Sequence, residues 1–290
     1  MITASEGYSA MEPQKLELSV GSANMGKELY EIANHLTTGN TVFASNAAVE
    51  LGQMALKPGG LNVICTQPSG EVSVRHMIKR IQAASLPGAL RDEVQCAAAC
   101  VGAISLIASE PTGANWIMDP YRVIEAHQSA DHHRTLLQGL GTLLHMDPTS
   151  TGEAVCCWAN LCQSPRTPEK LNELADKEAR PIFAGLVGAL YTQPTRVGEQ
   201  AVEALLLLLD ADYIRRRIYR FAGWDRMLIG ELCDLLRTAS KKLAMAVLCQ
   251  AVGYDDLRHQ LLARVDALSP MVAELAVLVR CGGDDTAMAC

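Results

Sequence analysis

Residues 95–108 read QCAAACVGAISLIA, an apolar stretch of helical length built mainly from small side chains. A helix that is apolar on almost every side, with Ala and Gly where a neighbour comes close, belongs in the middle layer of a stack of helices. The repetition of such stretches therefore predicts an α-solenoid. They are residues 46–56 (NAAVELGQMAL), 134–144 (RTLLQGLGTLL), 153–162 (EAVCCWANLC), 181–191 (PIFAGLVGALY), 200–209 (QAVEALLLLL) and 242–252 (KLAMAVLCQAV).

The composition of the 290-residue chain favours helices throughout. Hydrophobic residues make up 49% and aromatic residues only 4%, so the core is built from Leu, Ala, Val, Ile and Met, which helices accommodate well. Val and Ile do not cluster in alternating runs, and no pair of strands is indicated. We therefore predict an all-α fold. We expect a flexible N-terminal arm at residues 1–21, one helical repeat domain at 22–281 and a flexible tail at 282–290, with the first helix starting near Ser22 or Asn24.

The predicted helices are of two kinds. Residues 94–108 and 243–252 are apolar nearly all round and are expected to form inner helices. Residues 169–180 are amphipathic, with Leu171, Leu174 and Ala175 on one face, and are expected to form an outer helix. Residues 72–86 are a second outer helix, with Val74, Met77, Ile78 and Ile81 aligned on the buried side.

The central glycines of four apolar stretches give a rough period. Gly52, Gly102, Gly141 and Gly188 are 50, 39 and 47 residues apart. These intervals scatter around the roughly 40 to 47 residues of known two- and three-helix repeats. A non-repeating helical bundle could produce the same irregular spacing, so the alternatives of array and bundle stay open.

The apolar stretches resemble the third, buried helix of armadillo repeats over residues 40–280. The closest likeness is in residues 153–162, where Ala154, Trp158, Ala159 and Leu161 match the family's pattern. The resemblance implies a right-handed α-solenoid of armadillo/HEAT-like repeats that binds other proteins. Importin-type arrays place an Asn one turn after the repeated Trp. Here Cys162 follows Trp158 and Asn160 is out of register, which argues against nuclear-localisation peptides as ligands.

Charge and hydropathy exclude several classes of function. The net charge of −7 argues against nucleic-acid binding, which requires a dominant basic surface. No apolar run reaches 18 residues, so no membrane span is predicted. The N-terminal sequence lacks the apolar centre of a signal peptide, and the ten cysteines lack zinc-site spacing. We therefore expect reduced thiols, no cofactor and a cytoplasmic protein, with association with the cytoskeleton or a nuclear location as alternatives.

Two groups of side chains are candidates for function. In the first, basic residues on helix surfaces would receive an acidic segment of a protein partner, with Trp224 as an apolar anchor. The residues of this group are Arg75, Lys79, Arg216, Arg217, Arg220 and Trp224. In the second, His127, His132 and His133 would bind a transition metal. The ordinary alternatives are a solvated helix face for the basic residues and a helix start capped by Asp131 for the histidines.

The preferred function is that of a non-catalytic scaffold or adaptor, because no P-loop, HExxH or GxSxG motif occurs in the sequence. The partner would lie along a groove formed by successive inner helices. The alternatives are an all-α metal-dependent protein or enzyme centred on the histidines, and a structural helical subunit of a larger complex.

Overall fold

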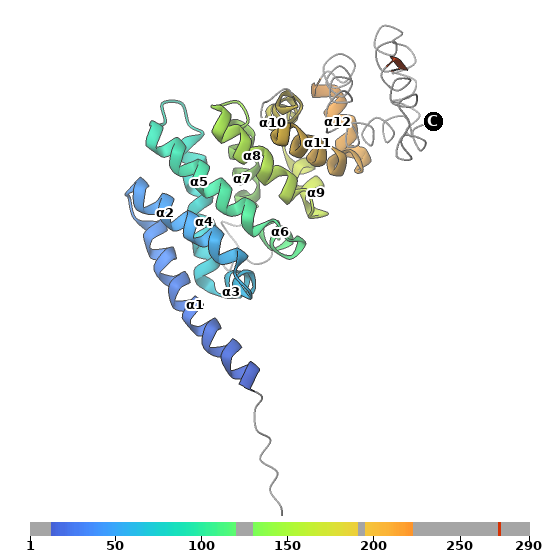
Figure 1. Cartoon of the computed structure of the whole chain (residues 1–290). Helices are drawn as coiled ribbons and strands as arrows, with labels where there is room; N and C mark the ends of the chain where they lie inside the picture. The colour runs from blue at the N-terminus through green and yellow to red at the C-terminus, as the bar shows by residue number, and fades with distance from the viewer. Residues whose placement is uncertain (1–12, 120–129, 191–194, 223–271, 274–290) are drawn as a thin grey trace, which may run out of the picture.

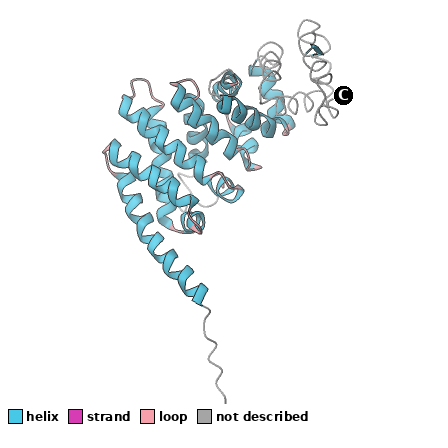
Figure 2. Ribbon diagram, viewed as in Figure 1, coloured by secondary structure: helices cyan, strands magenta, loops and turns pink. Residues whose placement is uncertain are grey.

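The computed structural model describes residues 13–119, 130–190, 195–222 and 272–273, with only the backbone given at residues 13–22, 130–132, 195 and 219–222. Within these ranges the protein is helical and contains no strand (Figure 2), which confirms the all-α prediction there. The helices are α1 (Pro13–Thr37), α2 (Thr41–Leu56), α3 (Gly60–Thr66), α4 (Pro68–Ala84), α5 (Arg91–Ile107), α6 (Pro111–Ile117), α7 (Ala130–Leu143), α8 (Pro148–Leu161), α9 (Arg166–Glu173), α10 (Asp176–Ala189), α11 (Thr195–Leu209) and α12 (Asp212–Ala222).

The longer helices lie in two rows, side by side (Figure 1). One row, called the inner row here, consists of α2, α5, α8 and α11, each packed on the next. The outer row consists of α1, α4, α7 and α10, which contact one another in the same order. The short helices α3, α6 and α9 precede α4, α7 and α10, so a unit of one short and two long helices recurs. The inner helices begin at Thr41, Arg91, Pro148 and Thr195, which are 50, 57 and 47 residues apart.

The glycine alignment made from the sequence is wrong, because it mixes the two rows. Gly52 and Gly102 lie on the inner helices α2 and α5, but Gly141 and Gly188 lie on the outer helices α7 and α10. Close approach is not confined to the inner row: a Cβ atom at Gly141 would lie 2.5 Å from Ile182 Cγ1 on α10. Close packing at a central glycine therefore does not tell which row the helix belongs to, and Gly188 of α10 has no neighbour within 4 Å.

The first helix begins earlier than expected. α1 starts at Pro13, so residues 13–21, predicted to belong to a flexible arm, are helical. The expected tail at residues 282–290 and the predicted inner helix at 243–252 lie outside the described residues.

The outer helix predicted over residues 169–180 is two helices. α9 ends at Glu173 and α10 begins at Asp176, with the backbone of Leu174 extended between them (φ −69°, ψ 139°). Glu178 stabilises the new start, because its carboxylate accepts a hydrogen bond of 2.9 Å from the backbone N–H of Ala175. Leu174 is buried as predicted, whereas Ala175 is exposed.

Prolines stand at the first position of four of the twelve described helices, α1 among them, because their fixed φ and missing N–H are tolerated there. At α8 the preceding residue, Asp147, caps the helix by accepting hydrogen bonds from the N–H groups of Thr149 (3.0 Å) and Ser150 (3.2 Å). Pro181 is an exception, since it lies inside α10. The first positions of α4, α6 and α8 are Pro68, Pro111 and Pro148.

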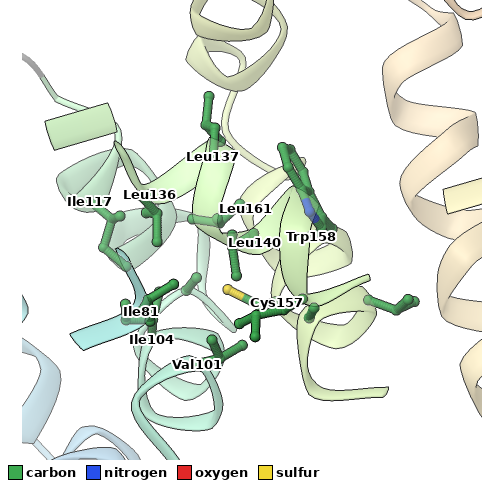
Figure 3. Close-up of a cluster of buried hydrophobic side chains, with 14 of the residues drawn as sticks. Ile81, Val101, Ile104, Ile117, Leu136, Leu137, Leu140, Cys157, Trp158 and Leu161 are labelled. Atoms are coloured by element: carbon green, nitrogen blue, oxygen red, sulfur yellow. The ribbon is translucent and has the colours of Figure 1, made fainter. Parts of the chain in front are cut away.

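The hydrophobic core lies between the two rows (Figure 3). Trp158 on α8 is fully buried, in agreement with its predicted place in the core. Since burial of apolar surface is the main force in folding, this shared interface holds the rows together. The part of the core drawn in Figure 3 includes Ile81 of α4, Val101 and Ile104 of α5, Leu136 and Leu140 of α7, and Cys157 and Leu161 of α8. The predicted buried side of α4, Val74, Met77, Ile78 and Ile81, is confirmed.

Side chains from later helices cap the carboxyl ends of earlier ones. Arg80 of α4 donates hydrogen bonds to the carbonyl oxygens of Leu36 (3.3 Å) and Thr38 at the end of α1. His133 of α7 contacts the carbonyl oxygen of Ile117, the last residue of α6, at 3.1 Å through Nε2. These carbonyls have no partner within their own helices, so each cap satisfies a group that folding would otherwise leave unpaired.

The close approach of α2 and α5 is testable at Gly52, where a Cβ atom would lie 2.8 Å from Leu106 Cδ1 and 3.2 Å from Ala103 Cα. We expect Gly52→Ala to lower the free energy of unfolding by about 1–2 kcal/mol, since overpacking outweighs the gain in helix propensity. Gly26→Ala on α1, where nothing lies within 4 Å, is expected to raise it by about 0.5–1 kcal/mol. Urea denaturation measures the free energy of unfolding of the two variants. Equal values for Gly52→Ala and Gly26→Ala would contradict the close packing of α2 on α5.

Candidate binding surface

The other described helices leave one side of the inner row uncovered, and this side is called the open face here. On α2 it exposes Val42, Val49 and Leu56, with 65%, 48% and 62% of each residue accessible. Because these residues are seven positions apart, they lie on one stripe of the helix. The open face further comprises Gln53 of α2, Gln95, Gly102 and Leu106 of α5, Glu153, Cys156 and Asn160 of α8, and Gln200, Glu203 and Leu207 of α11.

The open face is hollowed between the starts of α5 and α8. A cavity of about 340 Å³ lies there, with Gln95 and Ala98 on one side and Thr149 on the other. Arg91, the first residue of α5, and the capping Asp147 lie at its edge. The small side chain of Ala98 contributes to this hollow, since it projects little beyond the backbone of α5.

Hydrogen bonds join three inner helices across the floor of the open face. The sulfur of Cys156 accepts from Ser105 Oγ of α5 (3.3 Å) and from Gln200 Nε2 of α11 (3.2 Å). Asn160 Nδ2 donates to the carbonyl oxygen of Ser105 (2.9 Å) and to its Oγ (3.0 Å). The side-chain NH₂ groups of Asn160 and Gln200 therefore point into the protein. Together these hydrogen bonds fix the positions of α5, α8 and α11 relative to one another.

Glu153 is the most unusual charged group of the open face. Its carboxylate lies over Gly102 of α5, where an added Cβ atom would come within 3.1 Å of Oε2. Partial burial raises the pKa of this carboxyl group above its ordinary value of 4.5. No ion pair to Glu153 is found among the described residues. It is thus a half-buried carboxylate that the described part of the protein does not neutralise.

Of the predicted α12 arginines whose side chains are described, Arg216 is exposed but Arg217 is not. Arg217 was expected to project outward, but only 12% of its side chain is accessible. It donates to the carbonyl oxygens of Leu171 (2.9 Å) and Leu174 (2.8 Å) and pairs with Asp176 at 3.1 Å. Arg217 therefore caps the carboxyl end of α9, and the requirement to satisfy those carbonyls explains why the prediction was wrong.

The other predicted basic residues are scattered. Arg216 is exposed, with 70% of its side chain accessible, and pairs with Asp212 at 3.0 Å. Arg75 lies on α4 in the outer row and pairs with Glu71 at 2.7 Å, whereas Lys79 on the same helix is exposed. The side chain of Arg220 and the whole of Trp224 lie outside the described residues. Arg75 and Lys79 belong to a different row from the open face.

Of the three histidines predicted to bind a metal, the structure describes the side chain of His133 alone. His133 is buried, and its Nε2 contacts the carbonyl oxygen of Ile117. His132 lies on α7 without a described side chain, and His127 falls outside the described residues. In the part of the chain that is described, no group of three or more His, Cys, Asp or Glu side chains gathers around a possible metal position.

Sequence reasoning missed the polar contacts of Ser105, Cys156 and Gln200. These residues are far apart in the chain and carry no motif. One signal was present: Asn160 directly follows the apolar run 154–159 of α8, and a polar side chain in that setting needs a partner.

The capping role of Arg217 is testable against its neighbour. We expect Arg217→Gln to lower the free energy of unfolding by about 2 kcal/mol, because it removes charged hydrogen bonds to the end of α9. Arg216→Gln is expected to change it by less than about 0.5 kcal/mol, as for other exposed ion pairs. Guanidinium denaturation of the two variants measures the difference. A similar loss in both would show that Arg217 has no special structural role.

The environment of Glu153 predicts a pH dependence. Its pKa is higher in the folded than in the unfolded chain, so the ionised carboxylate opposes folding above the folded pKa, and this effect disappears below about pH 4.5. Glu153→Gln is therefore expected to stabilise the protein at pH 7 by about 0.5 kcal/mol, a value that allows for solvent screening, and by nothing at pH 4. Thermal unfolding at the two pH values measures this. Glu50→Gln, an exposed carboxylate of α2, is the matched control.

Comparison with protein-family models and with curated proteins found no match to this sequence. Among the described helices, none is long and apolar enough to cross a lipid bilayer. The arrangement of the open face is therefore the basis on which a function can be argued.

Proposed function

We propose that this protein is a non-catalytic scaffold or adaptor that binds a peptide or protein partner along the open face. In this proposal the recurring units form an armadillo/HEAT-like array, a right-handed α-solenoid. The unit of one short and two long helices supports it, since repeats of two or three helices build such arrays. The order of contacts also supports it, because each long helix packs on its counterpart in the next unit.

The observation that carries the proposal is the exposed apolar stripe on α2. Val42, Val49 and Leu56 share one line of the helix and remain accessible, although the opposite side of α2 is fully buried. Leu106 of α5 continues the apolar surface on the neighbouring helix, where it contacts the position of Gly52. Exposed apolar side chains that gather on one face are typical of an interaction site.

The packing of the inner row favours binding. The backbone of each inner helix is fixed by neighbours in its own row and in the outer row. Side chains on such a row are already positioned, so little conformational entropy is lost when a partner binds. A partner segment would lie across α2, α5, α8 and α11 and would contact one or two side chains from each.

A selection of random peptides displayed on phage, performed on the full-length protein, tests the proposal. We expect the enriched peptides to bind the double variant Val49→Ser/Leu56→Ser at least tenfold more weakly, which corresponds to about 1.4 kcal/mol. Val72→Ser is the matched control, because Val72 is an exposed valine on the outer helix α4. Fluorescence anisotropy with the synthetic peptides measures the affinities. Equal affinity for the double variant and the control would overturn the open face as the binding site.

A further inference from the structure

Acidic residues outnumber basic residues on the inner helices that form the open face. Beyond their first turns, the four inner helices contain no Lys or Arg. Arg91 and Arg196, near the starts of α5 and α11, are the basic residues of these helices. The acidic residues that follow the first turns are Glu50 of α2, Glu153 of α8, and Glu199 and Glu203 of α11.

The neutral polar side chains of the open face add hydrogen-bond acceptors to this charge. Asn160 uses its NH₂ group on Ser105, and Gln200 uses its NH₂ group on Cys156. An amide that has committed its donors presents its oxygen to a ligand. The oxygens of Asn160 and Gln200 accept no hydrogen bond from the described residues. The amide oxygens of Asn160 and Gln200 are therefore hydrogen-bond acceptors on α8 and α11, the helices that also carry Glu153 and Glu203.

The apolar and the acceptor-rich parts of the open face lie at different helices. Val49 and Leu56 of α2 and Leu106 of α5 form the apolar part. Glu153 and Asn160 of α8 and Glu203 of α11 form the acceptor-rich part. A single segment that crosses the inner row would meet the two in succession.

We propose that the partner is a basic peptide segment, with Lys or Arg side chains over α8 and α11 and apolar side chains beside α2 and α5. This inference rests on the proposed function and names the chemistry of its ligand. Arg and Lys carry only donors, so they complement a surface of carboxylate and amide oxygens. The unpaired, half-buried Glu153 gains the most, since a bound cation provides the counter-charge that the described residues lack.

The same argument opposes the acidic partner expected from the sequence. The guanidinium of Arg217 is occupied by the end of α9, and Arg216 is paired with Asp212. An acidic segment on the open face would bring its carboxylates towards Glu153 and Glu203 without a basic side chain between them. Like charges brought together in this way weaken binding and slow association.

Synthetic versions of one phage-selected peptide test the inference. Three versions carry Lys, Gln or Glu at the same polar positions, and fluorescence anisotropy measures their binding to the full-length protein. We expect the Lys version to bind about tenfold more tightly than the Gln version at low salt, and the Glu version to bind most weakly. The advantage of the Lys version should shrink as salt is raised, because exposed charges are screened.

Variants of the protein locate the effect. We expect Glu153→Gln/Glu203→Gln to remove most of the preference for Lys, whereas Glu110→Gln, an exposed carboxylate at the start of α6, leaves it unchanged. If peptides require Val49 and Leu56 but show no preference for Lys, the inference fails and the proposed function stands. If no selected peptide depends on Val49 and Leu56, the proposed function fails and the inference with it. A preference for Lys that survives in the double Gln variant would overturn the assignment to Glu153 and Glu203.

Discussion

Neighbouring inner helices meet where one of them has no side chain, and the rest of the structure depends on this contact. At Gly52 the backbone of α2 lies directly against Ala103 of α5. At Gly102 the space above α5 is filled by the carboxylate of Glu153 from α8. Such close approach lets the inner helices lie side by side with their apolar sides buried. It also fixes the side chains of the open face at constant positions relative to one another.

The distribution of charge follows from how the helix ends are satisfied. Arg80 and Arg217 cap the ends of earlier helices, and Arg215 of α12 donates to the carbonyl oxygen of Leu209 at the end of α11. Arginine suits this role because its guanidinium presents several donors in a fixed plane. These arginines therefore point their guanidinium groups at helix ends within the protein. Glu153 and Glu203, in contrast, lie on the accessible side of the inner helices. In this acidic chain of net charge −7, the inner helices therefore carry carboxylates but no Lys or Arg beyond their first turns.

The sequence was sufficient to predict the helical class and the buried side of α4, because both depend on local periodicity. It also identified α2, α5, α8 and α11 as apolar, but it grouped α7 and α10 with them, since Gly141 contacts α10 as closely as Gly52 contacts α5. The role of Arg217 could not be predicted, because a helical projection places a side chain relative to its own helix only. Its acceptors lie on Leu171 and Leu174, more than 40 residues earlier in the chain. The contacts of Cys156 with Ser105 and Gln200 could not be predicted either, because these residues lie on three different helices.

The direction of the helix caps has a consequence for synthesis on the ribosome. A chain emerges from its N-terminus, and its early parts begin to fold before the later parts exist. The carboxyl end of α1 acquires its donors only when Arg80 has left the exit tunnel, and the end of α9 waits in the same way for Arg217. At these two places a later helix completes an earlier one, so a nascent chain that stops before Arg80 or Arg217 carries a helix end without its cap.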